Sequence, residues 1–248
     1  MEIIALISQK GGVGKTTSAV NIGAGLAQRG KRVLLIDLDA QGSLTHIMGG
    51  SAEGLTVLDV LQRKCQAKQA IQRAAQMDII AASEDLAVDG ILTKTGKEYR
   101  LREALQGLRE AYDYILLDCP PSLGILSINA LTAAQSCIIL AQADTLSLQA
   151  IRQLSGTIDV VRQYTNKSLG MRGILITRYS GRAILSRDAV EMIEAQAEAM
   201  GTRVFDTRIR EGIAIKEAQA MRQDIFSYAP RSNGAKDYTA LIAEILEG

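Results

Sequence analysis

The chain has 248 residues, of which 47% are hydrophobic and 22% are charged, and its formal net charge is +1. This composition is typical of a folded globular protein and excludes binding to nucleic acid through overall positive charge. Three widely spaced cysteines without a CxxC pair argue against a disulfide scaffold or a Cys/His metal site, and no apolar run approaches the ~20 residues of a membrane-spanning helix. We expect a single cytoplasmic domain over residues 1–248.

Apolar runs alternate with helical stretches along the chain. Strands are predicted at residues 3–7, 32–37, 77–81, 114–118, 136–141 and 173–177, and helices at 15–29, 97–110, 124–134, 146–164, 184–200 and 233–247. Several strand runs, such as residues 33–36, are continuously apolar, as expected of strands buried on both faces. The pattern predicts an α/β fold, a doubly wound and mostly parallel sheet flanked by helices, with ligands at the carboxyl ends of its strands.

A glycine-rich segment links the first predicted strand to the first helix. It reads Gln9, Lys10, Gly11, Gly12, Val13, Gly14, Lys15, Thr16, Thr17. The glycines allow successive N–H groups to surround an anion, Lys15 can reach the β and γ phosphates, and the Thr16 hydroxyl can hold Mg²⁺. Gln9 replaces the usual first glycine, and Lys10 adds a second cation. Strand, loop and helix in this order predict a nucleotide site.

Carboxylates follow two other predicted strands. Asp37 and Asp39 come after the second strand, where Asp37 can support the water shell of Mg²⁺ and Asp39 can orient the attacking water. Taken alone, this pair also suits a helix cap beside a surface acid. Asp118 ends four apolar residues at the fourth strand, so it is predicted to bind the Mg²⁺ shell as well.

The loop resembles the deviant Walker A motif of the ParA/MinD family of P-loop ATPases, and the resemblance extends over nearly the whole chain. It implies a ParA-type ATPase for DNA partition, with ATP and Mg²⁺ as cofactors and with Lys10, Lys15 and Asp39 in catalysis. The active form would be a homodimer sandwiching two ATP molecules, in which Lys10 contacts the nucleotide of the partner subunit. This dimer would bind double-stranded DNA without sequence preference, on the nucleoid, and a ParB-like partner would stimulate hydrolysis.

The same resemblance assigns residues in the last third of the chain. It places Thr177, Arg178, Ile209 and Arg210 near the nucleotide base. Ala214 occupies the position of the family's DNA-binding arginine. The cations proposed to contact DNA instead are Arg208, Arg210, Lys216 and Arg222. Because acidic residues are interspersed among them, an ordinary mixed surface is the alternative.

Other functions are compatible with a loop of this kind. A MinD-like membrane ATPase would need a basic amphipathic helix at the C-terminus, but here the stripe Leu241, Ile242, Ile245 and Leu246 is flanked by acids and is better explained as core, so no membrane partner is expected. An iron–sulfur reductase would need a cluster cysteine, and Cys119 lacks glycine-rich surroundings. A nucleotide-gated DNA-binding regulator with negligible turnover also remains open.

Overall fold

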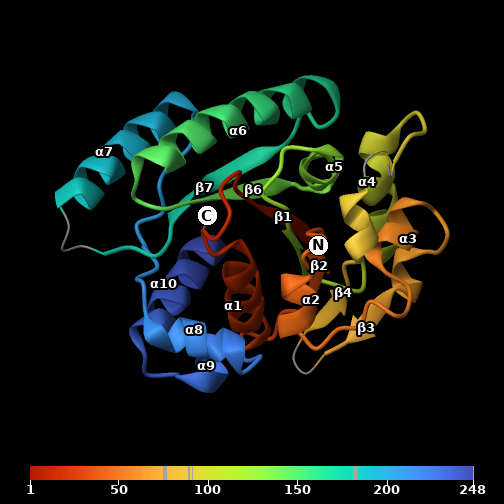
Figure 1. Cartoon of the computed structure of the whole chain (residues 1–248), viewed down its shortest axis with the longest axis horizontal. Coiled ribbons are helices and arrows are strands. Elements are labelled where there is room, and N and C mark those ends of the chain that lie inside the picture. Colours follow the sequence, from red (N-terminus) through yellow and green to blue (C-terminus); the bar gives the residue numbers. More distant parts are fainter. Residues whose placement is uncertain (75–76, 89, 91, 181–183, 248) are drawn as a thin grey trace.

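The computed structural model describes residues 1–74, 77–88, 90, 92–180 and 184–247. The strands are β1 (Glu2–Ile7), β2 (Val33–Asp37), β3 (Ile71–Arg73), β4 (Asp78–Ile80), β5 (Tyr114–Asp118), β6 (Ser136–Ala141) and β7 (Gly170–Ile176). They form one sheet in the order β3-β4-β2-β5-β1-β6-β7 (Figure 1). β3 pairs antiparallel with β4, and the other neighbours pair in parallel. The predicted doubly wound, mostly parallel sheet is therefore confirmed.

Helices cover both faces of the sheet. The α-helices are α1 (Lys15–Ala27), α2 (Ser43–Ile47), α3 (Val57–Leu61), α4 (Arg100–Leu105), α5 (Ile125–Ala133), α6 (Thr145–Tyr164), α7 (Ile184–Ala199), α8 (Ile213–Ala220), α9 (Ile225–Tyr228) and α10 (Asn233–Glu247). Short 3-10 turns occur at Ala67–Gln69, Glu84–Ala87, Lys97–Tyr99 and Gln106–Leu108. None of the helices in the described ranges is long and apolar enough to cross a bilayer.

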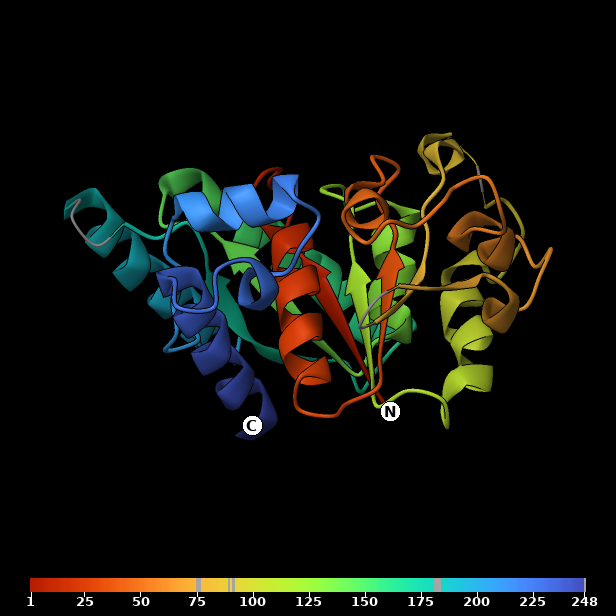
Figure 2. The ribbon, with the colours of Figure 1, turned by 90° about the horizontal axis from the view of Figure 1, so that it is seen from below.

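The core is divided into two layers by the sheet. In β1, Ile4 and Leu6 join a cluster with α1, α2 and α8 to α10, whereas Ile3, Ala5 and Ile7 join a cluster with α3 to α7. This alternation follows from the two-residue repeat of a strand, and it explains why β1 is apolar at every position from Ile3 to Ile7. Figure 2 shows α10 beside α1, with α8 across the end of α1 that follows the glycine-rich loop.

Close packing of α1 against α10 depends on a small residue. A Cβ atom at Gly25 would lie 2.0 Å from the Cδ1 atom of Ile242, so a larger side chain would require the Ile242 side chain or the helices to shift. Leu241, Ile242 and Ile245 are buried in this contact, as predicted for a core stripe. Leu246 was assigned to the same stripe but is 38% exposed, because it lies beyond the face that meets α1.

Several short elements differ from the predictions. The predicted helix at residues 97–110 is shorter and divided, with a 3-10 turn on each side of α4. β3, α3, α8 and α9 were not predicted; each has three to eight residues, which is too short to show a clear hydrophobic period. Thr56 is the N-cap of α3, where Thr56 and Asp59 form a reciprocal capping box.

Candidate functional site

The glycine-rich loop lies at the carboxyl ends of the central strands. Because β1 is paired with β5, and β5 with β2, the loop after Ile7 lies beside Asp37 and Asp118, which end β2 and β5. Gly12 and Gly14 adopt φ values of 71° and 88°, a left-handed conformation that side chains disfavour. The turn therefore requires glycine at both positions, and α1 starts directly after it.

Lys15, Thr16 and Asp118 form a buried group at the start of α1. The Thr16 hydroxyl donates to Asp118 Oδ2 at 2.6 Å, while Asp118 Oδ1 is buried without a hydrogen-bond partner among the described residues. Burial, then repulsion from Asp37, raises the pKa of Asp118 to about 8. Burial lowers the pKa of Lys15, although Asp118 acts in the opposite direction. The unpartnered carboxylate oxygen and adjacent hydroxyl are hard oxygen donors, so the residues present fit Mg²⁺.

Asp37 and Asp39 have different surroundings. Asp37 is fully buried and accepts hydrogen bonds from the backbone N and the hydroxyl of Thr45, both at 2.8 Å, and from Asp39 N at 3.1 Å. Burial raises its pKa to about 6. The Asp39 carboxylate is half-buried and accepts one hydrogen bond, from Gln41 N at 3.1 Å. Asp37 thus holds the start of α2 in place, and Asp39 is accessible for contact with a bound molecule.

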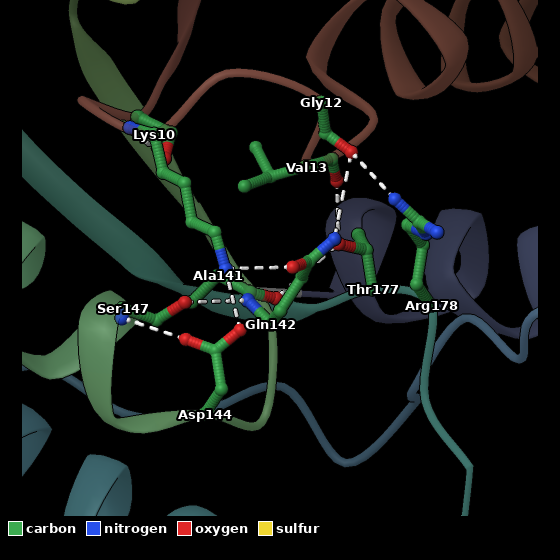
Figure 3. A network of polar contacts seen from close by, with 10 residues as sticks. Lys10, Gly12, Val13, Ala141, Gln142, Asp144, Ser147, Thr177 and Arg178 are labelled. Atoms are coloured by element: carbon green, nitrogen blue, oxygen red, sulfur yellow. Dashed lines mark hydrogen bonds and ion pairs between the residues drawn. The ribbon is translucent and has the colours of Figure 1, made fainter.

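Lys10 is folded back onto its own chain (Figure 3). Its ammonium group donates to Gln142 Oε1 at 2.8 Å and to Asp144 Oδ2 at 2.5 Å. Asp144 also caps α6 by accepting from Ser147 N at 2.9 Å. Burial raises the pKa of Asp144, but hydrogen bonds from Lys10 and Ser147 outweigh it and lower the pKa overall. Sequence analysis did not find Gln142 or Asp144, which lie more than 130 residues from Lys10.

A cavity of about 190 Å³ adjoins the loop on the side of α8 and α10. Its lining includes Thr177, Arg178, Ile209 and Arg210, the four residues predicted to lie near the base, together with loop residues Gly12, Gly14 and Thr17. The Thr177 hydroxyl donates to Val13 O at 2.5 Å, and Arg178 Nη1 donates to Gly12 O at 3.3 Å (Figure 3). These bonds fix the cavity wall directly to the loop.

Two further lining residues were missed by sequence analysis. Gln219 of α8 donates from Nε2 to the Thr17 hydroxyl at 2.7 Å, and Tyr238 of α10 lies 3.1 Å from the Ser18 hydroxyl. Tyr238 is buried, so it forms the floor of the cavity. No local motif marks either residue, because each reaches the site only through packing against α1.

The four cations predicted to contact DNA are held by neighbouring side chains. The ion pairs are Arg208 with Glu194 (3.3 Å), Arg210 with Asp237 (2.6 Å) and Lys216 with Glu211 (3.0 Å). Arg208 also stacks over the ring of Tyr179, 5.0 Å from its centre. Arg222 Nη2 lies 3.4 Å from His46 Nδ1, and Arg222 is exposed. The structure thus supports the alternative of a mixed surface for three of the four residues in this state.

Known proteins resemble this chain over nearly its whole length. The family model described as AAA domain matches residues 1–171. The sporulation initiation inhibitor protein Soj of Bacillus subtilis is 38% identical over 250 residues, covering 98% of both chains. The chromosome-partitioning ATPase Soj of Thermus thermophilus is 40% identical, covering 98% of this chain and 94% of its own.

A solved structure agrees with these sequence relatives in fold. The structure named cobyrinic acid a,c-diamide synthase from Mycobacterium smegmatis, with a bound ATP analogue and magnesium, superposes with a TM-score of 0.86 at 34% identity. The superposition covers 100% of this chain and 95% of that one. Together with the loop, the strand-end carboxylates and the sheet order, these matches establish that the chain belongs to the ParA/Soj-type family of partition ATPases.

Proposed function

We propose that this chain is a magnesium-dependent ATPase that drives DNA partition, with residues 1–248 forming one catalytic domain. The observation that carries the proposal is the combination of a phosphate-binding loop with two lysines, two strand-end aspartates and Asp39 just after β2, at one edge of the sheet. Relatives named as chromosome-partitioning ATPases support the same assignment. The protein would act in the cytoplasm and associate with the nucleoid when it holds ATP.

The buried group beside the loop suits phosphate and metal binding. The N–H groups of Gly11 to Gly14 and the Lys15 ammonium would surround the β and γ phosphates. Thr16 and Asp118 would hold Mg²⁺, with Asp37 acting through water. When bound, the metal ion would neutralise charge that develops on the phosphate oxygens. Occupation would supply the unpartnered Asp118 oxygen with a partner that the described residues do not provide, and would give the Lys15 ammonium, which donates to Lys10 O at 3.4 Å, an anionic neighbour.

Hydrolysis would require Asp39 and a second subunit. Asp39 would orient the water that attacks the γ phosphorus while the bond to the ADP oxygen breaks. Lys10 would leave Asp144 and contact the phosphates of the ATP bound to the partner subunit. The active form would be a homodimer with two ATP molecules between its subunits. A cation supplied in this way contributes about 10³–10⁵ in rate in related phosphoryl-transfer enzymes. Its position on Asp144 supports slow turnover by the isolated subunit.

The ATP-bound dimer would bind the phosphates of double-stranded DNA. A ParB-like partner would stimulate ATP hydrolysis and so release the dimer from the DNA. Arg222 is the cation we propose to test first, because it is exposed and contacts His46 rather than a carboxylate. Arg208, Arg210 and Lys216 would have to exchange a carboxylate for a DNA phosphate. The pairs of Arg208 and Lys216 are largely exposed and weak, at about 0–1 kcal/mol each, so exchange is energetically accessible for these two cations. Arg210 would leave behind the buried carboxylate of Asp237, so its exchange is more costly.

The test is binding to a random-sequence duplex at low salt, without nucleotide and with ADP, ATP or a non-hydrolysable ATP analogue. We expect tight binding only with ATP or the analogue, weakening steeply as salt rises. Arg222→Ala should weaken binding and reduce the salt dependence, whereas Arg109→Ala, at an exposed arginine near α4, should change neither. If the protein binds ATP but does not bind DNA under any of these nucleotide conditions, this function is excluded. A protein or membrane scaffold would then be tested instead.

A further inference from the structure

A second cavity, of about 550 Å³, lies at the edge of the molecule that carries β3. Its walls come from the end of α3, residues 63–69 after it, and the segment from Arg100 to Leu108, on the right in Figure 1. It shares no lining residue with the cavity beside the phosphate loop. This second cavity is therefore separate from the nucleotide site, and its volume lies within the range of small-molecule sites.

The lining of this cavity is strongly cationic. Its charged residues are Arg63, Lys64, Lys68, Arg100 and a single acid, Glu103. Glu103 forms an ion pair with Arg63, and Lys64 lies 3.8 Å from an oxygen of Asp59, which is outside the lining. Within the described ranges, Lys68 and Arg100 have no carboxylate partner. The excess positive charge is thus concentrated in one concave place, although the chain as a whole is nearly neutral.

Arg100 is the buried part of this charge. The residue is 8% exposed, and its Nε atom is buried without a hydrogen-bond partner among the described residues. Its backbone is fixed at the start of α4, where the next residue, Leu101, donates its N–H to Asn129 Oδ1 at 3.1 Å. A buried N–H group without an acceptor is costly, since it has lost water and gained no hydrogen bond in exchange. The Nε–H group of Arg100 therefore lacks an acceptor, and a bound anion would supply one.

We propose that this cavity binds a small anion bearing a phosphate group, held by Arg100 and Lys68. The planar guanidinium matches two phosphate oxygens at once, and the lysine adds a point charge. Because Arg100 lines the cavity and is buried, the anionic group must enter the cavity to reach it, as a terminal phosphate can. The site is additional to the ATPase site and does not depend on the function proposed above.

The half-buried thiol of Cys65 gives a local test, because it also lines the cavity, whereas Cys119 and Cys137 are fully buried. The rate of Cys65 alkylation would be measured in the full-length Lys15→Ala protein, so that the phosphate loop does not compete for the probe. We expect pyrophosphate to slow alkylation several-fold in a saturable manner, and sodium chloride at equal ionic strength to have little effect. An alkylation rate unaffected by pyrophosphate over the millimolar range would overturn the proposal.

Paired variants locate the binding group. In the same Lys15→Ala background, Arg100→Met keeps the length of the stem and removes the charge, so protection by pyrophosphate should be lost. Arg109→Met removes an exposed arginine outside the cavity and should keep protection. If Arg100→Met does not fold, Lys68→Met, at an exposed position, should weaken protection instead. Full protection in a folded Arg100→Met protein, or protection by a polyglutamate peptide and not by pyrophosphate, would refute the proposed ligand class.

Discussion

The carboxyl edge of the sheet and the surface of α8 and α10 hold their charges in opposite ways. At the sheet edge, Lys15 and Asp118 are buried, and one Asp118 oxygen has no partner among the described residues. On the surface formed with α8 and α10, Lys216 and its acid Glu211 are both exposed, at 64% and 41% of their side chains. Buried charges are poorly solvated and gain most from a specific ligand, whereas exposed pairs exchange partners at little cost. The first region is prepared for one ligand, and the second can adapt.

The largest effect should come from Lys15. We expect Lys15→Ala to abolish ATP binding, because a buried ammonium beside the phosphates is not replaced by solvent. Lys167→Ala, which removes an exposed lysine outside the cavity beside the loop, should weaken ATP binding by less than about fivefold. Calorimetric titration of both variants makes the comparison. Tight ATP binding by Lys15→Ala would contradict the assignment of Lys15 to the phosphate-binding site.

Substitution of Asp39 should affect ATP hydrolysis without affecting ATP binding. We expect Asp39→Ala to keep ATP binding and ATP-dependent dimerisation while hydrolysis falls by roughly 10²–10⁴, the usual contribution of a group that directs a reacting water. Phosphate release and light scattering measure the two properties. Asp206→Ala, at an exposed acid on the second surface, is the control and should keep its turnover. Wild-type hydrolysis by Asp39→Ala would show that another group orients the water.

Burial of Asp118 should appear in the pH dependence of stability. Its pKa is raised from 3.8 to about 8, so the stabilising contribution of its protonated form is present below the unfolded pKa and is lost as pH rises through about 8. The nucleotide-free protein should lose up to about 1.4 kcal/mol of unfolding free energy per pH unit in this window, with Asp37 acting in the same direction. Asp118→Asn should flatten the dependence, and the exposed-site control Asp85→Asn should not. Urea unfolding at several pH values measures this, and an unchanged slope in Asp118→Asn would contradict it.

The smallest effect should come from the contact between Lys10 and Asp144. Their side chains are 25% and 38% exposed, so the pair is partly screened by solvent and contributes at most about 1 kcal/mol. Asp144→Asn should therefore lower the ATP concentration needed for dimerisation by no more than about fivefold, since Lys10 is released more easily. Sedimentation against ATP concentration tests this. A higher requirement for ATP would mean that Asp144 helps the dimer form.

Local motifs made much of the site predictable from sequence. The glycine-rich loop and the aspartates that end β2 and β5 lie next to strands with continuous apolar runs, so their positions follow from the sheet alone. Asp144 and Gln219 contact residues of the loop that are more than 130 positions away in the sequence. Only the packing of the folded chain brings them together. The family assignment and the ATPase class were both correct.

The missed parts have a common physical origin. β3 has three residues, none of them fully buried, so its sequence carries no strand pattern. The acids that pair with Arg208 and Arg210 lie on α7 and α10, and no local spacing shows that they will meet these cations. Elements stabilised mainly by distant contacts could not be predicted from a single sequence.

The cavity of about 190 Å³ beside the loop, where we expect the nucleotide base to bind, lies in a different part of the sequence from the phosphate site. Apart from Gly12, Gly14 and Thr17, its walls come from residues between Thr177 and Tyr238, beyond the 1–171 range of the AAA domain match. We therefore expect phosphate chemistry and base recognition to depend on separate parts of the sequence. Substitutions in the last third of the chain would then change nucleotide preference while the residues that act on the phosphates stay the same.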